Sequence, residues 1–140
     1  MDMRARRSVG LPVYTSPEAV VSDLNPGYPV FCVRPHEIKA VARRFLDGFP
    51  GDVLYAVKCN PEPHMLDALS EAGIRHFDTA SLAEVAKVGE LFPDATSYFM
   101  HPVKSRAAIL SAHKVYGVKY FVVDHVSELE KIASIIPPGL

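Results

Sequence analysis

Short apolar runs alternate with helical patterns along this 140-residue chain, and that alternation limits its fold more than any other feature. Runs suited to β-strands lie at residues 29–33, 53–57, 74–77, 96–100 and 118–123. After each run, apolar residues recur with the period of an α-helix, at residues 35–47, 61–72, 81–91, 103–116 and 126–136. Repeated β-then-α units predict a parallel sheet with right-handed crossovers.

Two α/β architectures share this pattern, an open doubly wound sheet and a (β/α)8 barrel of the TIM type. An open dinucleotide-binding sheet should have a Gly-x-Gly-x-x-Gly turn after its first strand, and no strand–helix junction here contains one. A complete barrel needs about 250 residues, whereas this chain contains about five β/α units. The sequence therefore predicts the N-terminal part of a barrel, incomplete in this chain.

The composition excludes several classes of partner. The chain is 49% hydrophobic and 22% charged, with a formal net charge of -1, so it offers no electrostatic argument for binding nucleic acid or an anionic membrane. No apolar run approaches the roughly 20 residues of a membrane helix. Cys32 and Cys59 are too few and too separate for a disulfide framework or a zinc site, so a reducing cytoplasm is the expected location.

Polar residues end four of the apolar runs: Lys58, Asp78, His101 and Asp124. The carboxyl ends of parallel strands lie at one edge of a sheet, where ligands bind, so these side chains are expected to converge on one mouth. The pattern by itself is not specific, because every strand must emerge into solvent somewhere.

Lys58 has two interpretations. It is either a solvated cation on an apolar stem or a partly desolvated amine that can form a Schiff base. A helix beginning at Pro61, with Asn60 as its N-cap, would place positive amide dipoles nearby and disfavour the ammonium form. The position alone leaves both interpretations open.

The neighbouring polar residues also have structural explanations. Asp78 is either a turn residue or a partner of the lysine or of a cofactor. Ser81 and Glu84 form a Ser-x-x-Glu capping box, which explains both residues without a ligand. Lys104 is expected to lie at an ordinary solvated helix start.

Three segments together resemble a known family. They read YAVKCNP at residues 55–61, FDTASLAE at 77–84 and FMHPVKS at 99–105. In this order and spacing they resemble the ornithine/diaminopimelate/arginine decarboxylases, pyridoxal-phosphate enzymes of the alanine-racemase-like fold, and most of all their bacterial ornithine decarboxylase branch. The resemblance extends from about residue 29 to the C-terminus.

This resemblance implies that residues 29–140 form the first part of a cofactor-binding barrel and that residues 1–28 contribute to a β-domain. Lys58 matches the lysine that forms a Schiff base with pyridoxal 5'-phosphate. Asp78 matches an aspartate near that bond, and Glu84 matches a supporting acid close to the cofactor. His101 replaces an asparagine of eukaryotic relatives and receives no role. The implied reaction decarboxylates a basic amino acid, most narrowly L-ornithine to putrescine.

Other functions stay open within and beyond this resemblance. The substrate could instead be lysine, arginine, diaminopimelate or carboxynorspermidine, or the protein could be an inactive regulatory homologue like the antizyme inhibitors. A racemase is disfavoured by the segment CNPEP after Lys58. The family's glycine-rich phosphate loop, pyridine-nitrogen partner and dimer-donated residues have no counterpart in these 140 residues. We therefore expect this piece alone to be inactive and the full-length protein to act as a homodimer on a small amino acid.

Overall fold

A four-stranded, all-parallel sheet lies at the centre of the computed structural model, which describes residues 12–137. The strands are β1 (Leu54–Ala56), β2 (His76–Thr79), β3 (Thr96–Phe99) and β4 (Tyr120–Phe121), in the order β1-β2-β3-β4. Strands that follow one another in the chain are therefore neighbours in the sheet, as in a (β/α)8 barrel. The predicted parallel α/β architecture is confirmed.

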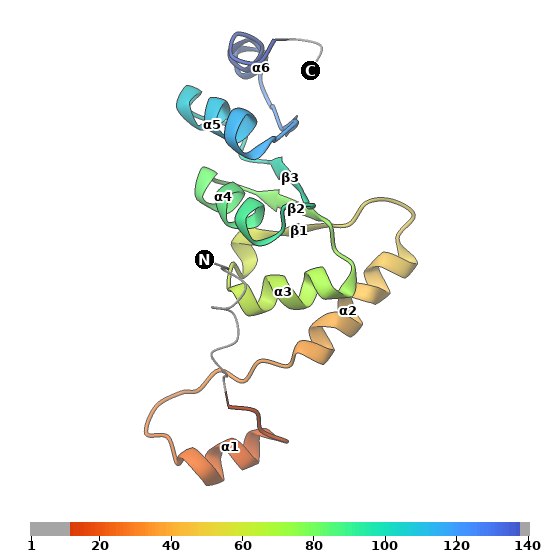
Figure 1. Ribbon diagram of the computed structural model, residues 1–140, viewed down its shortest axis with the longest axis vertical. Helices are drawn as coiled ribbons and strands as arrows, with labels where there is room; N and C mark the ends of the chain where they lie inside the picture. Colours follow the sequence, from red (N-terminus) through yellow and green to blue (C-terminus); the bar gives the residue numbers. More distant parts are fainter. Residues whose placement is uncertain (1–11, 138–140) are drawn as a thin grey trace.

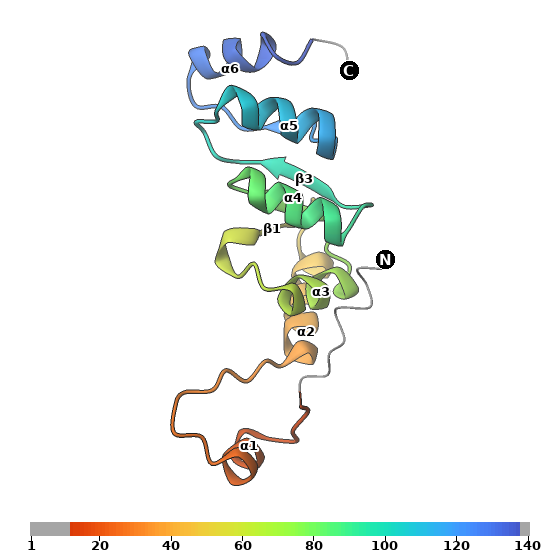
Figure 2. The ribbon, with the colours of Figure 1, turned by 60° about the vertical axis from the view of Figure 1, so that its left-hand side comes forward.

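Helices lie before, between and after the strands along the chain. They are α1 (Pro17–Leu24), α2 (Pro35–Gly48), α3 (Pro63–Ala72), α4 (Leu82–Leu91), α5 (Arg106–Tyr116) and α6 (Val126–Ala133). Figure 1 shows α4 and α5 on the same side of the sheet, and Figure 2 shows the helices in chain order from α1 at one end to α6 at the other. None of the helices within residues 12–137 has the length and apolar character that crossing a bilayer requires.

The two faces of the sheet differ because side chains alternate along each strand. Phe77 and Thr79 of β2 are fully buried, and Phe77 belongs to a core cluster with Leu66 and Val88 of the flanking helices. A second cluster joins Val85, Phe99, Ala112 and Val118. The opposite face carries His76 and Asp78, which are only half-buried. This alternation leaves Asp78 on the face that the helix–sheet cores do not use.

Gly73 ends α3, as the sequence predicts. Its φ is 117°, a left-handed conformation that favours glycine, and the adjacent Ile74 N–H donates to the Leu69 carbonyl. An added Cβ would also meet Leu46 Cδ1 at 3.2 Å, so a larger residue would adopt a strained backbone and displace the end of this side chain.

The predicted strand at residues 29–33 is wrong. The segment is irregular and exposed, and Phe31 is 96% exposed. A strand is stable only when a neighbour accepts and donates its backbone hydrogen bonds, and within residues 12–137 the sheet begins at β1. The apolar composition of this segment was therefore not sufficient to make it a strand.

Two helices begin later than the sequence predicts. Pro63, not Pro61, is the first residue of α3, and the Asn60 side chain accepts a hydrogen bond from the Glu62 N–H instead of capping a helix. A residue before proline is pushed out of the helical region, and Glu62 accordingly has a ψ of 135°. Similarly, α5 begins at Arg106 because Ser105 is its N-cap, with Oγ accepting from the Ala108 N–H.

Two features of the helices were not predicted. The helix α1 begins after Ser16, whose hydroxyl accepts from the Ala19 N–H, and the segment Ser-Pro-Glu at its start is a recognisable N-cap signal. In α6 the apolar residues Val126 and Leu129 are exposed, whereas Glu128 is buried. The buried residue of α6 is thus an acidic one, whereas Glu130 on the same helix is exposed.

Candidate functional site

Lys58 lies on a short 3-10 turn, η2 (Val57–Cys59), immediately after β1. Val57 is fully buried in the core, which fixes the start of the turn. Two side chains brace the residues that follow: the Tyr55 hydroxyl donates to the Asn60 carbonyl at 3.3 Å, and Lys87 Nζ donates to the Pro61 carbonyl at 3.0 Å. Burial raises the pKa of Tyr55, which keeps its hydroxyl protonated as a donor. Lys58 therefore projects from a well-anchored turn.

The amine of Lys58 makes no hydrogen bond or ion pair with any residue between 12 and 137. Its side chain is exposed, so within this part of the chain the amine is solvated, which agrees with the first of the two interpretations. The predicted helix dipole at Asn60 is absent there, because α3 begins only at Pro63. What remains is an unpaired primary amine at the carboxyl end of a parallel strand, a group that can attack a carbonyl carbon once deprotonated.

Asp78 lies beside this turn on the half-buried face of the sheet. It pairs in register with Ala56 of β1 on one side and with Tyr98 of β3 on the other. Paired residues of adjacent strands are about 5 Å apart, so Asp78 is one strand spacing from the end of β1, the strand that leads into the turn of Lys58. No hydrogen bond or ion pair joins Asp78 to Lys58 or Glu84 among the described residues.

Glu84 holds the turn that follows β2. Its Oε2 accepts from the Ala80 N–H at 2.8 Å, while the Ser81 hydroxyl accepts from the Glu84 N–H at 3.3 Å. In a standard capping box this carboxylate would accept from the N–H of Ser81, the N-cap residue. Here it accepts from the N–H of Ala80, one residue earlier. Thr79 closes the same turn by donating its hydroxyl to the Tyr98 carbonyl at 2.8 Å. The turn beside Asp78 is rigid for these reasons.

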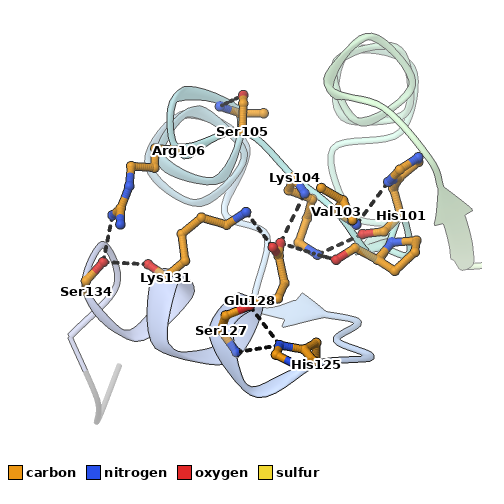
Figure 3. A network of polar contacts seen from close by, with 12 residues as sticks. His101, Val103, Lys104, Ser105, Arg106, His125, Ser127, Glu128, Lys131 and Ser134 are labelled. Carbon is orange, nitrogen blue, oxygen red and sulfur yellow. Dashed lines mark hydrogen bonds and ion pairs between the residues drawn. The ribbon is translucent and has the colours of Figure 1, made fainter.

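Lys104 contradicts its predicted role as a solvated residue. Its side chain is completely buried, and Nζ lies 2.7 Å from the carbonyl oxygens of His101 and Val122 and 3.2 Å from Glu128 Oε1 (Figure 3). The Phe99 ring centroid is 5.9 Å from the same nitrogen. A buried ammonium is stable only when its N–H groups find acceptors, and here they do.

Glu128 is the anion of this buried cluster. One carboxylate oxygen accepts from both the backbone N–H and the amine of Lys104, and the other pairs with Lys131. The hydrogen bond from Lys131 and those from Lys104 lower the pKa of Glu128 from 4.5 to about 2. This carboxylate is therefore ionised at neutral pH and neutralises the buried lysine.

Sequence reasoning missed the Lys104–Glu128 pair because nothing local indicates it. The two residues are 24 positions apart, and neither stands in an apolar pattern that would predict burial. His101 and Asp124, the other polar strand ends, are both exposed. The His101 Nδ1 accepts from the Val103 N–H at 3.1 Å.

A parallel α/β sheet with consecutive strands as neighbours and an unpaired lysine after its first strand resembles the carboxyl-end edge of a (β/α)8 barrel, where ligands bind. A family sequence model, described as "Pyridoxal-dependent decarboxylase, pyridoxal binding domain", matches residues 36–138. The chain belongs to this family of pyridoxal-dependent decarboxylases, whose cofactor is pyridoxal phosphate.

Individual relatives agree with this assignment. The chain is 40% identical over 86 residues to the lysine/ornithine decarboxylase of Selenomonas ruminantium, which is 61% of this chain and 21% of that protein. It is 45% identical over 80 residues to the chloroplastic ornithine decarboxylase of Nicotiana glutinosa, covering 56% of this chain and 18% of that one. The chain thus spans about a fifth of the length of these curated relatives.

Solved structures resemble the fold as well. The lysine/ornithine decarboxylase of Vibrio vulnificus complexed with putrescine is similar with a TM-score of 0.71 and 33% sequence identity. The similarity covers 84% of this chain and 32% of the Vibrio chain. The sheet and the helices α2 to α6 are therefore part of an alanine-racemase-like barrel, as predicted.

The residues present fit pyridoxal phosphate in chemistry. The cofactor's aldehyde requires a lysine amine that is not already engaged, and among the two lysines that follow the ends of β1 and β3 only Lys58 meets that condition. Lys104 has its N–H groups saturated. Asp78 supplies a carboxylate on the neighbouring strand, where it pairs with Ala56.

Proposed function

We propose that this chain contributes to a decarboxylase of basic amino acids in which Lys58 is the attachment point for pyridoxal phosphate. The observation that supports the proposal is the unpaired amine of Lys58, held on a braced turn at the mouth of β1 within a pyridoxal binding domain. When bound, the cofactor supplies an electron sink for the pair of electrons that departing carbon dioxide leaves behind.

Asp78 and Glu84 have different roles in the proposal. Asp78 pairs in register with Ala56, two residues before Lys58, so its carboxylate stands on the strand next to the attachment point and would contact the bound groups. Glu84 acts through the backbone, because its hydrogen bond to the Ala80 N–H orients the turn between Asp78 and α4. Lys58 and Asp78 would thus touch the bound groups, whereas Glu84 would position them.

We further propose L-ornithine as the substrate and putrescine as the product. The support is the resemblance of residues 55–61, 77–84 and 99–105 to the ornithine decarboxylase branch, together with 45% identity to the Nicotiana ornithine decarboxylase. Lysine is the second candidate, because the Selenomonas relative is a lysine/ornithine decarboxylase. Ornithine and lysine both carry a cationic side chain, so either substrate agrees with a decarboxylase of basic amino acids.

The cellular compartment and the oligomeric state of the enzyme are part of the same proposal. We infer a cytoplasmic homodimer, as the family resemblance implies. Cys32 and Cys59 are both exposed free thiols, which suits a reducing compartment. Sedimentation of the full-length protein tests the dimer, and a monomer with full activity would contradict it.

The substrate is tested by incubating the full-length protein with pyridoxal phosphate and, in turn, ornithine, lysine, arginine and diaminopimelate. Released carbon dioxide and the amine product are both measured. We expect kcat/KM for ornithine to exceed that for the other amino acids by about tenfold or more. A tenfold ratio corresponds to a difference of about 1.4 kcal/mol in transition-state stabilisation. A preference for another basic amino acid would contradict the ornithine assignment. No turnover with any of them would contradict the decarboxylase proposal.

A further inference from the structure

Lys104 occupies the carboxyl end of the sheet but is not available for chemistry. Its ammonium reaches the carbonyl oxygens of His101 and Val122 at 2.7 Å each and Glu128 Oε1 at 3.2 Å, with a longer contact of 3.4 Å to the Pro102 carbonyl. An ammonium has three N–H groups, and all of them are engaged. These acceptors come from the loop after β3, the end of β4 and the helix α6 (Figure 3).

The same loop is fixed a second time through its backbone. The Lys104 N–H donates to Glu128 Oε1 at 3.0 Å, so a single carboxylate oxygen binds both the main chain and the side chain of Lys104. The other oxygen pairs with Lys131. We call Lys104 and Glu128 the clamp. It ties residues 101–104 to α6 with interactions that solvent cannot easily replace, because the Lys104 side chain is fully buried.

The clamp also holds His101 in this loop, because the His101 carbonyl oxygen accepts a hydrogen bond from Lys104 Nζ. The Val103 N–H donates to His101 Nδ1 at 3.1 Å, so in the neutral ring the proton is on Nε2. His101 is exposed, and the preceding Met100 N–H bonds to the Thr79 carbonyl at 2.8 Å, which places His101 beside the end of β2. Two strand spacings, about 10 Å, separate its strand from that of Lys58.

We propose that Lys104 is a positioning residue, whose clamp holds His101 so that its Nε2–H donates to an oxyanion bound at the mouth of the barrel. The proposal rests on the proposed function, which places two oxyanions there: the phosphate of the cofactor and the carboxylate of the amino acid. A neutral N–H donor aimed at such an oxygen contributes only when its direction is fixed, and the clamp supplies that fixation.

A double-mutant cycle on the full-length protein tests the coupling. The variants are His101→Ala, Lys104→Met, the two combined, and Lys131→Met as the matched control. Lys131→Met removes a lysine from the same carboxylate without touching the loop. We expect each of the first two to lower kcat/KM by about tenfold or more and the combination to be no worse than either, because coupled residues are not additive. Lys131→Met should stay within about twofold, because it leaves both contacts of Lys104 with Glu128 in place.

The origin of the loss identifies the oxyanion. A raised Kd for pyridoxal phosphate in both single variants indicates the cofactor phosphate, and a raised KM for the amino acid at saturating cofactor indicates the substrate carboxylate. Either result supports the proposal. Additive effects of the two substitutions, or an effect of His101→Ala below about twofold, would overturn it.

A second measurement does not depend on turnover. Amide hydrogen exchange in the peptide that covers residues 101–106 should be about tenfold faster in Lys104→Met than in Lys131→Met. Equal exchange in these two variants would overturn the clamp. If Lys104→Met does not fold, Glu128→Gln replaces it, because the amide keeps an acceptor oxygen but removes the charge. A parent protein that shows no turnover and does not bind the cofactor contradicts the proposed function, whereas the exchange comparison still decides the clamp.

Discussion

Two lysines follow the ends of parallel strands in this chain, and their surroundings are opposite. Lys58, after β1, is exposed and has no partner among residues 12–137. Lys104, after β3, is completely buried and has two carbonyls and a carboxylate within hydrogen-bond distance. Both stand in segments that resemble the same family, yet only one amine is free to react.

The difference shows how a fold separates a reactive lysine from a structural one. The turn of Lys58 is braced through neighbouring residues, so its amine contributes little to holding the structure together. Lys104 is itself the brace, and its charge is neutralised by Glu128. Removing the first amine should therefore affect chemistry, and removing the second should affect stability.

The largest expected effect is on activity at Lys58. The variant Lys58→Ala should lower kcat by about a thousandfold or more, because no other amine replaces a covalent attachment point. The matched control is Lys114→Ala on the exposed side of α5, which should leave kcat unchanged. Turnover of Lys58→Ala within tenfold of the parent would break the distinction between the two lysines.

The second effect is on stability at Lys104. The variant Lys104→Met should lower the free energy of unfolding by about 3 kcal/mol, the typical result of removing one partner of a buried ion pair. Lys58→Met should change it by less than about 0.5 kcal/mol, as exposed substitutions do. Chemical denaturation of the two variants measures both values. Equal losses of unfolding free energy in Lys104→Met and Lys58→Met would contradict the claim that only the buried lysine stabilises the fold.

The third effect is a pH dependence that Glu128 should introduce. Its pKa is lowered from 4.5 to about 2, so the folded state favours the ionised form. The contribution to stability is therefore complete above pH 4.5 and decreases as the pH falls toward 2. Unfolding curves at several pH values should show a smaller pH dependence for Glu128→Gln than for the parent.

The control for this pH experiment is Glu71→Gln. Glu71 also pairs with a lysine, Lys39, but its side chain is 62% exposed. Its variant should follow the parent across the same pH range, because exposed ion pairs contribute little. If Glu128→Gln and the parent instead gave parallel curves, the account of the buried carboxylate would be wrong.

The smallest effect is at the turn beside Asp78. Ser81→Ala removes the hydroxyl that accepts from the Glu84 N–H and should cost about 1 kcal/mol in the free energy of unfolding. Ser111→Ala, the same chemical change inside α5, should change it by less than about 0.5 kcal/mol. A calorimetric difference of zero between them would show that the cap does not hold this turn.

The sequence predicted the order of elements because each depends on local information. Apolar runs, helical periodicity and the stop at Gly73 are properties of a few neighbouring residues. The segment at residues 29–33 was mistaken for a strand because strand formation depends on a partner that composition does not reveal. The starts of α3 and α5 shifted because Pro63 and Ser105 override the periodic pattern.

The site was predictable only in part for the same reason. Family resemblance indicated Lys58, Asp78 and Glu84, and Ser81 and Glu84 do cap the same turn. The buried clamp was not predicted, because Lys104 and Glu128 meet only after β3, β4 and α6 have packed together. Long-range charge pairs leave no periodic signal, so a structure is needed to find them.

The most direct test of the account is to find which lysine carries the cofactor. The full-length protein is loaded with pyridoxal phosphate, treated with borohydride to make the bond permanent, digested, and analysed by mass spectrometry. We predict a single modified peptide that contains Lys58, with Lys104 unmodified because its buried amine is fully engaged. Modification at Lys104, or at no lysine within this chain, would contradict the central claim.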